Sequence, residues 1–290
     1  MVDQAQGLRE LFQTRQPAEG NHTTRIITVT SGKGGVGKSN FTLNFALTLQ
    51  RRGYKVLIFD ADIGLANLDV LMGETPRYNL YHLLKRQKTI WEIIHRYYDL
   101  LYIAGGSGFQ ELLRLSEQDL EHFVNEVNKL NGHVDYIFFD TGAGLSKETL
   151  RFIIASDETF VITTPEPTAI TDAYAIIKMV SNMNYDVEFR LIINRVSERR
   201  EGKLTADKIS MVAKQFLDLD IPALGYVLDD IHVSKAVKRQ VPFTIAYPHS
   251  AASKAVSELV DQFLSAREQT ADSGRGVRSF LSRMIRLLQN

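Results

Sequence analysis

Cysteine is absent from the 290 residues of this chain. Its absence excludes a disulfide framework, a thiolate metal site, an iron–sulfur cluster and a cysteine nucleophile. The seven histidines include no H-E-x-x-H pair, and no carboxylates accompany them at the spacing of a zinc site. We therefore interpret them as ordinary surface or core histidines, and we expect a reducing, cytoplasmic setting.

Long apolar runs are also missing, and the formal net charge is zero. No run approaches the roughly 20 residues that a membrane span needs, and residues 1–20 lack the layout of a secretory signal. The 34 basic and 34 acidic side chains cancel, so any attraction to nucleic acid or to an anionic membrane has to be local. With 44% apolar residues, one large domain is the first expectation.

What is present is an alternation of short β-branched runs with helical patterns. The runs favour buried strands at residues 25–30, 54–60, 100–104, 136–140, 158–164, 187–194 and 222–228. Helical spacing is found at residues 40–52, 116–130, 147–155, 168–184, 203–217 and 250–267. This order predicts an α/β fold, with a doubly wound, mostly parallel sheet and helices on both of its faces.

The first predicted strand is followed by a glycine-rich stretch that opens a helix. It matches G-x-x-x-x-G-K-[ST] and consists of Gly32, Lys33, Gly34, Gly35, Val36, Gly37, Lys38 and Ser39, with Asn40 next in the helix. Such a phosphate loop closes backbone N–H groups around phosphate oxygens, with its last lysine along the β- and γ-phosphates and its hydroxyl on Mg²⁺. By chance the pattern occurs in roughly 1% of chains this long, and the flanking strand and helix lower that figure. A nucleoside triphosphate is implied.

Two predicted strands end in aspartates at the same edge of the sheet. Asp140 follows four hydrophobic residues, the position from which a carboxylate holds Mg²⁺, usually through water, and residues 141–144 follow it as a switch loop. Asp60 ends another strand, and Asp62 lies two residues further, close to the phosphate end of the sheet. For Asp60 we expect a structural or metal-shell role. The alternative for Asp62 and Asp140 is that they cap helices.

A second lysine, Lys33, lies inside the phosphate loop and gives the stretch K-G-G-V-G-K-S. In this the sequence resembles the deviant Walker A family of ATPases, the MinD and ParA group. The resemblance implies ATP and ADP as ligands, slow Mg²⁺-dependent hydrolysis, and a homodimer that closes around two nucleotides. Lys38 would act in cis, and Lys33 would reach across to the partner's phosphates. Asp62 would position the attacking water and contribute, with Ser39 and Asp140, to the metal site. The alternative for Lys33 is a solvated loop lysine.

The base site is predicted from the strand at residues 191–195, which ends in Asn194 and Arg195. An asparagine amide can pair with a purine edge, and in the resembling family an N-R dipeptide does this for adenine. The alternative for Asn194 is a turn former. Glu166, in the stretch T-x-P-E-P-T at residues 163–168, matches a family element that lines the nucleotide and the dimer surface. We assign it no chemical step.

The C-terminal stretch, residues 275–290, has apolar side chains at three- and four-residue steps, together with four arginines and no acid. The rest of the chain therefore carries 30 basic against 34 acidic side chains. A detached, basic, amphipathic helix is predicted to bind an anionic membrane, reversibly alone and more strongly in a dimer. The predicted membrane-facing residues are Val277, Phe280, Leu281, Met284, Ile285 and Leu288. The alternative is a helix docked on its own core.

The N-terminal stretch resembles the D-Q-A-x-x-L-R element of the flagellar branch of this family, the FlhG (YlxH or FleN) regulators of flagellar number and placement. The matching residues are Asp3, Gln4, Ala5, Leu8 and Arg9. The resemblance implies that this segment binds the GTPase FlhF and that Gln4 helps to complete the GTP site of FlhF. Residues 63–73, IGLANLDVLMG, also agree with this branch. The alternative is a frayed tail.

Three parts are therefore expected. Residues 1–24 form a partner-binding segment and linker, residues 25–267 a MinD-like ATPase domain, and residues 268–290 a linker and membrane-targeting helix. The expected function is an ATPase at the inner face of the cell membrane that regulates flagellar number and placement and activates FlhF, with flagellar basal-body switch proteins as further partners.

Other functions stay open. MinD-type positioning of the cell-division site shares the chemistry and the tail, and only residues 1–12 argue against it. ParA-like DNA partitioning needs a basic surface that the acidic core does not offer, so no direct nucleic-acid partner is expected. A metabolic P-loop enzyme is disfavoured because cysteines for a cluster and a ligase substrate motif are both missing.

Overall fold

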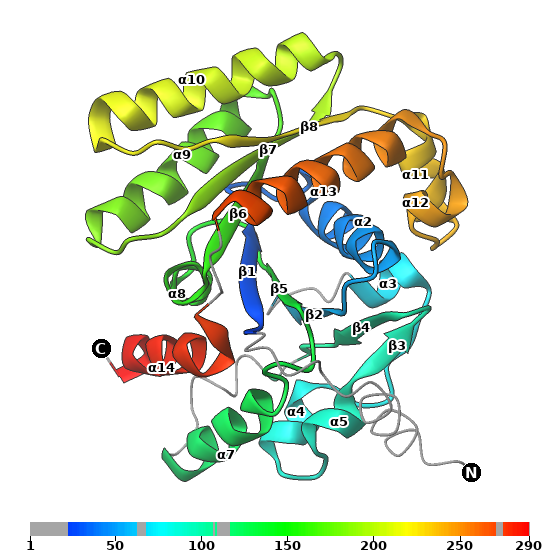
Figure 1. Ribbon diagram of the computed structural model, residues 1–290, viewed down its shortest axis with the longest axis vertical. Helices are drawn as coiled ribbons and strands as arrows, with labels where there is room; N and C mark the ends of the chain where they lie inside the picture. Colours follow the sequence, from blue (N-terminus) through cyan, green and yellow to red (C-terminus); the bar gives the residue numbers. More distant parts are fainter. Residues whose placement is uncertain (1–22, 63–67, 107, 109–116, 271–274, 290) are drawn as a thin grey trace.

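The structure is a computed structural model, and it describes residues 23–62, 68–106, 108, 117–270 and 275–289. Within these residues, one sheet of eight strands has the order β3-β4-β2-β5-β1-β6-β7-β8 (Figure 1). The strands are β1 (Arg25–Thr30), β2 (Val56–Ala61), β3 (His95–Tyr97), β4 (Leu100–Ile103), β5 (Tyr136–Thr141), β6 (Glu158–Thr163), β7 (Phe189–Val196) and β8 (Ala223–Leu228). All neighbours are parallel except β3 and β4.

This order confirms the predicted doubly wound, mostly parallel sheet. β1 lies in the middle, β5, β2 and β4 lie on one side of it, and β6, β7 and β8 lie on the other. Sequence analysis missed the antiparallel edge strand β3, because three residues are too few to show an alternating pattern. The strand order reverses at β1, and ligands of such sheets bind at the carboxyl edge next to that reversal.

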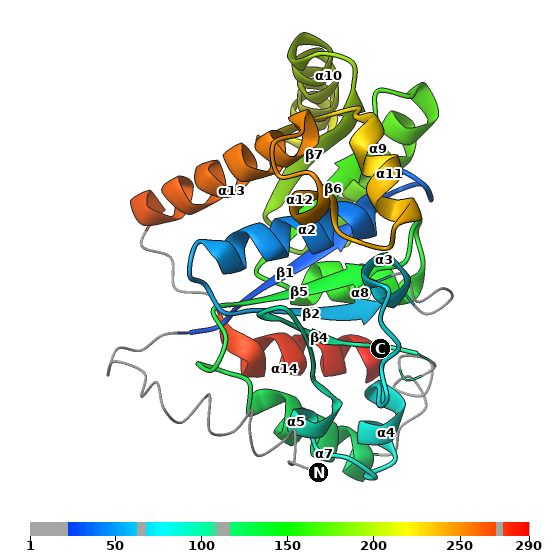
Figure 2. The same ribbon diagram turned by 90° about the vertical axis from the view of Figure 1, so that its right-hand side faces the viewer.

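Helices cover both faces of the sheet (Figures 1 and 2). They are α2 (Lys38–Arg51), α3 (Leu68–Met72), α4 (Leu80–Leu84), α5 (Ile90–Ile93), α7 (Glu117–Asn128), α8 (Lys147–Ala155), α9 (Pro167–Asn182), α10 (Arg199–Leu217), α11 (Ile231–Lys238), α12 (Phe243–Ala246), α13 (Ala251–Thr270) and α14 (Gly276–Gln289). Sequence analysis did not predict the short helices α3, α4, α5, α11 and α12.

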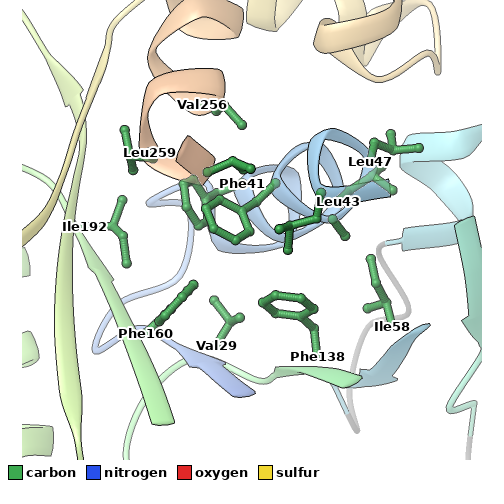
Figure 3. Close-up of a cluster of buried hydrophobic side chains, with 14 of the residues drawn as sticks. Val29, Phe41, Leu43, Leu47, Ile58, Phe138, Phe160, Ile192, Val256 and Leu259 are labelled. Atoms are coloured by element: carbon green, nitrogen blue, oxygen red, sulfur yellow. The ribbon is translucent and has the colours of Figure 1, made fainter. Parts of the chain in front are cut away.

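Alternate residues of a strand point to opposite faces of the sheet. Because helices cover both faces, the central strands are buried on both sides. Ile27 and Val29 of β1 join a cluster that α2, α3, α11, α12 and α13 cover, whereas Ile26 joins a cluster covered by α4, α5, α7, α8 and α14. In Figure 3, Phe41 and Leu43 of α2 lie above Val29, Phe138 and Phe160 of the sheet. This packing holds the N-terminus of α2 at the carboxyl edge of the sheet.

The C-terminal helix α14 is docked on the core, so the expectation of a detached helix is wrong for this structure. Val277, Phe280, Leu281 and Met284 are buried in the cluster beneath α7 and α8. The ring of Phe280 stacks on Phe139 of β5, with ring centroids 4.7 Å apart. The apolar face of a helix is removed from water equally well in a groove of the protein and in a lipid surface, and in this structure the protein supplies the groove.

The rest of the C-terminal region is described as far as residue 289. Ile285 is half-buried, and the side chain of Leu288 lies outside the described residues. Helix α13 runs through the predicted boundary between residues 267 and 268. None of the helices in the described ranges is both long and apolar enough to cross a bilayer.

Candidate nucleotide site

The phosphate loop lies between β1 and α2, at the carboxyl edge of the sheet. Gly37 is the N-cap of α2 and has a φ of 88°, a left-handed conformation that favours glycine, and no side chain caps the helix there. A Cβ atom on Gly37 would also lie 2.5 Å from Asn194 Nδ2. The first N–H groups of α2 are therefore not capped by a side chain, which is the arrangement that binds phosphate at a helix N-terminus.

Lys38 and Asp140 form a buried ion pair directly behind this loop. Lys38 Nζ donates to Asp140 Oδ1 over 2.9 Å and to Ser39 Oγ over 3.2 Å, and Thr42 Oγ1 donates to the same Asp140 oxygen. Asp140 is fully buried, and its Oδ2 atom has no hydrogen-bond partner among the described residues. A buried carboxylate oxygen without a donor is costly, and a hard cation such as Mg²⁺ is a ligand that would satisfy it.

Asp60 lies beside Asp140, since β2 and β5 pair these two residues. Burial, reinforced by the negative charge of Asp140, raises the pKa of Asp60 to about 7. The Asp60 carboxylate accepts hydrogen bonds from the backbone N–H of Asp62, at 3.2 Å, and of Leu68, at 3.4 Å. Asp60 thus holds both described ends of the loop that carries Asp62.

Asp62 lies next to the loop that follows β5. Its Oδ1 atom is 3.5 Å from the position that a Cβ atom on Gly142 would take. The predicted residues Ser39, Asp62 and Asp140 therefore come from three separate segments and meet at one edge of the sheet. Residues 63–67, in the loop after Asp62, lie outside the described residues.

Lys33, the additional lysine of the loop, is bound within its own chain. Its Nζ donates to Glu166 Oε2 and to Thr168 Oγ1, both over 3.1 Å. The side chains of Lys33 and Glu166 are 43% and 56% exposed, so both remain accessible to solvent. Glu166 and Thr168 flank the first residue of α9, and the predicted T-x-P-E-P-T element therefore does lie against the phosphate loop.

A cavity of about 640 Å³ adjoins the start of α2. It is lined by Gly37, Asn40, Phe41, Asn194, Arg195, Val227, Leu228, Asp229, Asp230, Ile231, Val233, Ser234, Val237, Lys238 and Phe243. Its volume and mostly apolar lining suit a nucleoside. Sequence analysis predicted Asn40, Asn194 and Arg195 for this site and missed the wall formed by α11 and α12. The signal for α11 was present, since Asp230 is an N-cap residue followed by apolar positions at helical spacing.

Asn194 and Arg195 lie at an irregular end of β7. The register between β7 and β8 shifts after Ile193, and Arg195 has a left-handed φ of 57°. Asn194 Nδ2 donates to the Val36 carbonyl over 2.7 Å, which ties β7 to the phosphate loop and leaves the Asn194 side-chain oxygen as an acceptor for a ligand. Arg195 is exposed and lies 3.7 Å from Asp229.

These groups define a class of protein: a P-loop nucleotide-binding protein in which a strand-end carboxylate pairs with the lysine of the phosphate loop and a cavity of nucleoside size lies beside it. A family model described as the CobQ/CobB/MinD/ParA nucleotide binding domain matches residues 27–243. The chain belongs to this family, as a MinD/ParA-like ATPase of the FlhG (YlxH/FleN) type, on the strength of that match and of two relatives described next.

The chain is 36% identical over 296 residues to the flagellum site-determining protein YlxH of Helicobacter pylori, covering 99% of this chain and 100% of that protein. It is 34% identical over 252 residues to the antiactivator FleN of Pseudomonas aeruginosa, covering 83% and 88%. A solved structure of the septum site-determining protein MinD with Mg-ADP, from Pyrococcus horikoshii, has the same fold, with a TM-score of 0.67, 24% identity, and 83% and 96% coverage.

The predicted partner-binding residues are not part of this site. Asp3, Gln4, Ala5, Leu8 and Arg9 lie outside the described residues. The predicted phosphate-loop, carboxylate and base residues are all described, and the structure brings them to one edge of the sheet.

Proposed function

We propose that this chain is a Mg²⁺-dependent switch ATPase that dimerises on ATP, binds the inner face of the cell membrane reversibly, and regulates flagellar number and placement. The observation that carries the ATPase chemistry is the buried Lys38–Asp140 pair, with an unsatisfied Asp140 oxygen beside an open helix N-terminus. The flagellar role is supported by the similarity to YlxH and FleN.

Lys38 has two possible anionic partners in this proposal. A triphosphate in the loop would offer its oxygens to Lys38 Nζ, which would leave Asp140 Oδ1 and so free the whole carboxylate. Ser39 and Asp140 are the residues that would hold Mg²⁺, with Asp62 nearby, and Mg²⁺ when bound neutralises charge on the β- and γ-phosphates. Asp62, held in place through Asp60, would orient the attacking water.

The base would enter the adjoining cavity. One amide hydrogen of Asn194 is engaged by Val36, so the side chain keeps its oxygen as an acceptor, which would match the amino group of adenine, and one N–H as a donor for a ring nitrogen. The guanine carbonyl at the same ring position would place two acceptors face to face. This difference favours ATP over GTP.

Dimerisation would require Lys33 to exchange partners. Its ion pair with Glu166 is exposed, and exposed pairs stabilise a fold by only about 0–1 kcal/mol. The pair therefore offers little resistance when the phosphates of a second protomer's nucleotide become available.

Membrane binding would require α14 to leave its groove. Phe280 of α14 stacks on Phe139, which directly precedes Asp140 in β5, and α8, the main contact of α14, follows the loop at residues 142–146. A structural change around Asp140 would therefore have a short path to the groove that holds α14, through β5 and through the loop at residues 142–146. Residues Arg278 and Arg286 are exposed on the docked helix and would meet anionic headgroups.

ATP turnover tests the chemistry. The full chain should hydrolyse ATP slowly with Mg²⁺ and stop when EDTA removes the metal. Asp62→Ala should bind ATP and dimerise but lose at least about tenfold in turnover, because the water is no longer oriented. Rapid hydrolysis by Asp62→Ala, or hydrolysis that is indifferent to EDTA, would contradict the assignment.

A partner assay separates the flagellar function from MinD-type division-site positioning. The full chain should accelerate GTP hydrolysis by FlhF, and the Gln4→Ala chain should not, although its own ATP turnover stays normal. Equal stimulation by both chains would reject the role of Gln4, and no stimulation by either would reject FlhF as the partner.

A further inference from the structure

Asn44 is a fully buried amide on α2, one helical turn beyond Asn40, on a helix whose residues Phe41, Leu43 and Phe45 belong to the hydrophobic core. Asparagine is a poor helix former, and a buried amide costs free energy unless its polar atoms are hydrogen-bonded. An apolar residue would serve the packing of α2 equally well. The amide therefore needs an explanation other than packing.

Its four hydrogen bonds join two distant elements. Asn44 Nδ2 donates to the backbone carbonyl of Asn40 over 2.8 Å and to Asn40 Oδ1 over 2.9 Å. Asn44 Oδ1 accepts from the backbone N–H and from the Oγ1 hydroxyl of Thr244, both over 2.9 Å. Both donor hydrogens and both lone pairs are used, so these bonds determine the orientation of the amide.

One partner of Asn44, Asn40, lines the cavity of the candidate nucleotide site, whereas Asn44 and Thr244 lie behind the lining residues. Asn40 lines the cavity from α2, and Thr244 directly follows Phe243, which lines it from α12. Asn44 Nδ2 donates to Asn40 Oδ1, which directs that oxygen towards Asn44, and the NH₂ group of Asn40 would then serve as a donor to a ligand. A second bond, from Arg51 Nη1 to the Thr244 carbonyl at 2.9 Å, also ties α12 to α2.

We propose that Asn44 is a positioning residue for recognition of the nucleotide base. It turns the Asn40 amide so that N–H donors face the cavity, and it sets the separation of the walls that α2 and α12 provide. With Asn194 Oδ1 as the acceptor for the amino group of adenine and the Asn40 NH₂ group as the donor to a ring nitrogen, the cavity matches adenine, whereas guanine has a carbonyl acceptor in place of that amino group. This inference rests on the proposed function, because it takes the occupant of the cavity to be the base of a nucleoside triphosphate.

The test separates the base from the phosphates. Dissociation constants for ATP, GTP and inorganic tripolyphosphate are measured by calorimetry with Mg²⁺ on the full chain and on Asn44→Ala. We expect Asn44→Ala to weaken ATP binding by about tenfold, the equivalent of one buried hydrogen-bonded contact, and to reduce the preference for ATP over GTP. Tripolyphosphate binding should stay within about twofold, since the phosphate loop is not changed.

Thr48→Val is the matched control. Thr48 Oγ1 donates to the Asn44 carbonyl over 2.7 Å, so this variant removes a buried hydrogen bond from the same helix one turn farther from the cavity. It should lower the melting temperature without changing ATP affinity. If Asn44→Ala weakens ATP and tripolyphosphate binding equally, or if Thr48→Val weakens ATP binding as much, the positioning role is overturned.

Two variants at Thr244 keep the proposal testable if Asn44→Ala does not fold. Thr244→Ser keeps the hydroxyl donor and should bind ATP nearly as the natural chain does, whereas Thr244→Val loses that donor and should bind ATP several-fold more weakly. Equal ATP affinities of these two variants would overturn the inference. A natural chain that binds neither ATP nor GTP would instead reject the proposed function itself.

Discussion

At the residue scale, the orientation of the charged side chains in the nucleotide site depends on the oppositely charged groups that they contact. Sequence reasoning predicted Lys38 and Ser39 from the phosphate-loop motif and Asp140 from its position at a strand end, but not that Lys38 would pair with Asp140. The motif predicts the nucleotide-bound arrangement, whereas a lysine on its flexible stem turns to whichever anion is within reach. Asn44 was missed for a related reason, since its importance comes from Thr244, 200 residues further along the chain.

Glu92 offers a pH-dependent prediction at this scale. Its carboxylate accepts from the backbone N–H and hydroxyl of Thr89 and from Lys88, each over 2.9 Å, and this capping of α5 lowers the pKa of Glu92 to about 2, with the Thr89 N–H as the largest cause. Because the folded carboxyl binds protons less readily than the unfolded one, its stabilisation is present above about pH 4.5 and is lost as the pH falls towards 2.

Glu92→Gln should therefore destabilise the chain by about 1 kcal/mol at pH 7, because the uncharged amide keeps an acceptor but loses the charge. The difference between the two chains should stay constant above about pH 5 and shrink as the pH is lowered below about 4.5 towards 2. Urea unfolding at several pH values measures it. Glu74→Gln, at an exposed residue outside any such cap, is the control, and a difference at Glu92 that does not vary with pH would contradict the prediction.

At the element scale, all seven predicted strands and the phosphate-loop helix were found, because hydrophobic periodicity and the loop motif are strong local signals. The position of α14 was not predictable in the same way. An amphipathic pattern predicts that one face of a helix is removed from water. Packing beneath α7 and α8 removes that face from water as well as a lipid surface does. In this structure the burial of Val277, Phe280, Leu281 and Met284, with Phe280 stacked on Phe139, decides for the core.

The membrane proposal is best tested at the charged face of α14, because its apolar residues also stabilise the core. Arg278→Glu with Arg286→Glu should leave the melting temperature nearly unchanged, since both side chains are exposed. Sedimentation with anionic vesicles in the presence of ATP should fall at least about tenfold, given about 1 kcal/mol for each basic residue near such a surface.

Lys203→Glu with Lys208→Glu is the charge-matched control for this experiment. Both lysines are exposed on α10, which packs against α9, β7 and β8 rather than against α14. This variant should sediment as the natural chain does. Unchanged sedimentation of the α14 variant, or an equal loss in both variants, would remove the support for α14 as the membrane anchor.

At the scale of the whole molecule, one chain supplies a phosphate loop, two strand-end aspartates and a cavity of nucleoside size at a single edge of the sheet. Lys33 of the phosphate loop contacts Glu166 and Thr168 at the surface. Such a site could bind a nucleotide alone, and the proposed role of Lys33 begins only when a second copy approaches. Dimerisation therefore tests whether the chain functions as half of a larger site.

With Mg²⁺ and a non-hydrolysable ATP analogue, the natural chain should sediment as a dimer in analytical ultracentrifugation, whereas Lys33→Ala should remain monomeric and still bind the analogue. The melting temperature of the Lys33→Ala chain should barely change, because this variant loses only an exposed ion pair. Glu166→Gln removes the same ion pair from the other side and should still dimerise, since Lys33 remains free to reach the partner's phosphates. Dimerisation of Lys33→Ala at the natural affinity would show that this lysine acts only within its own chain.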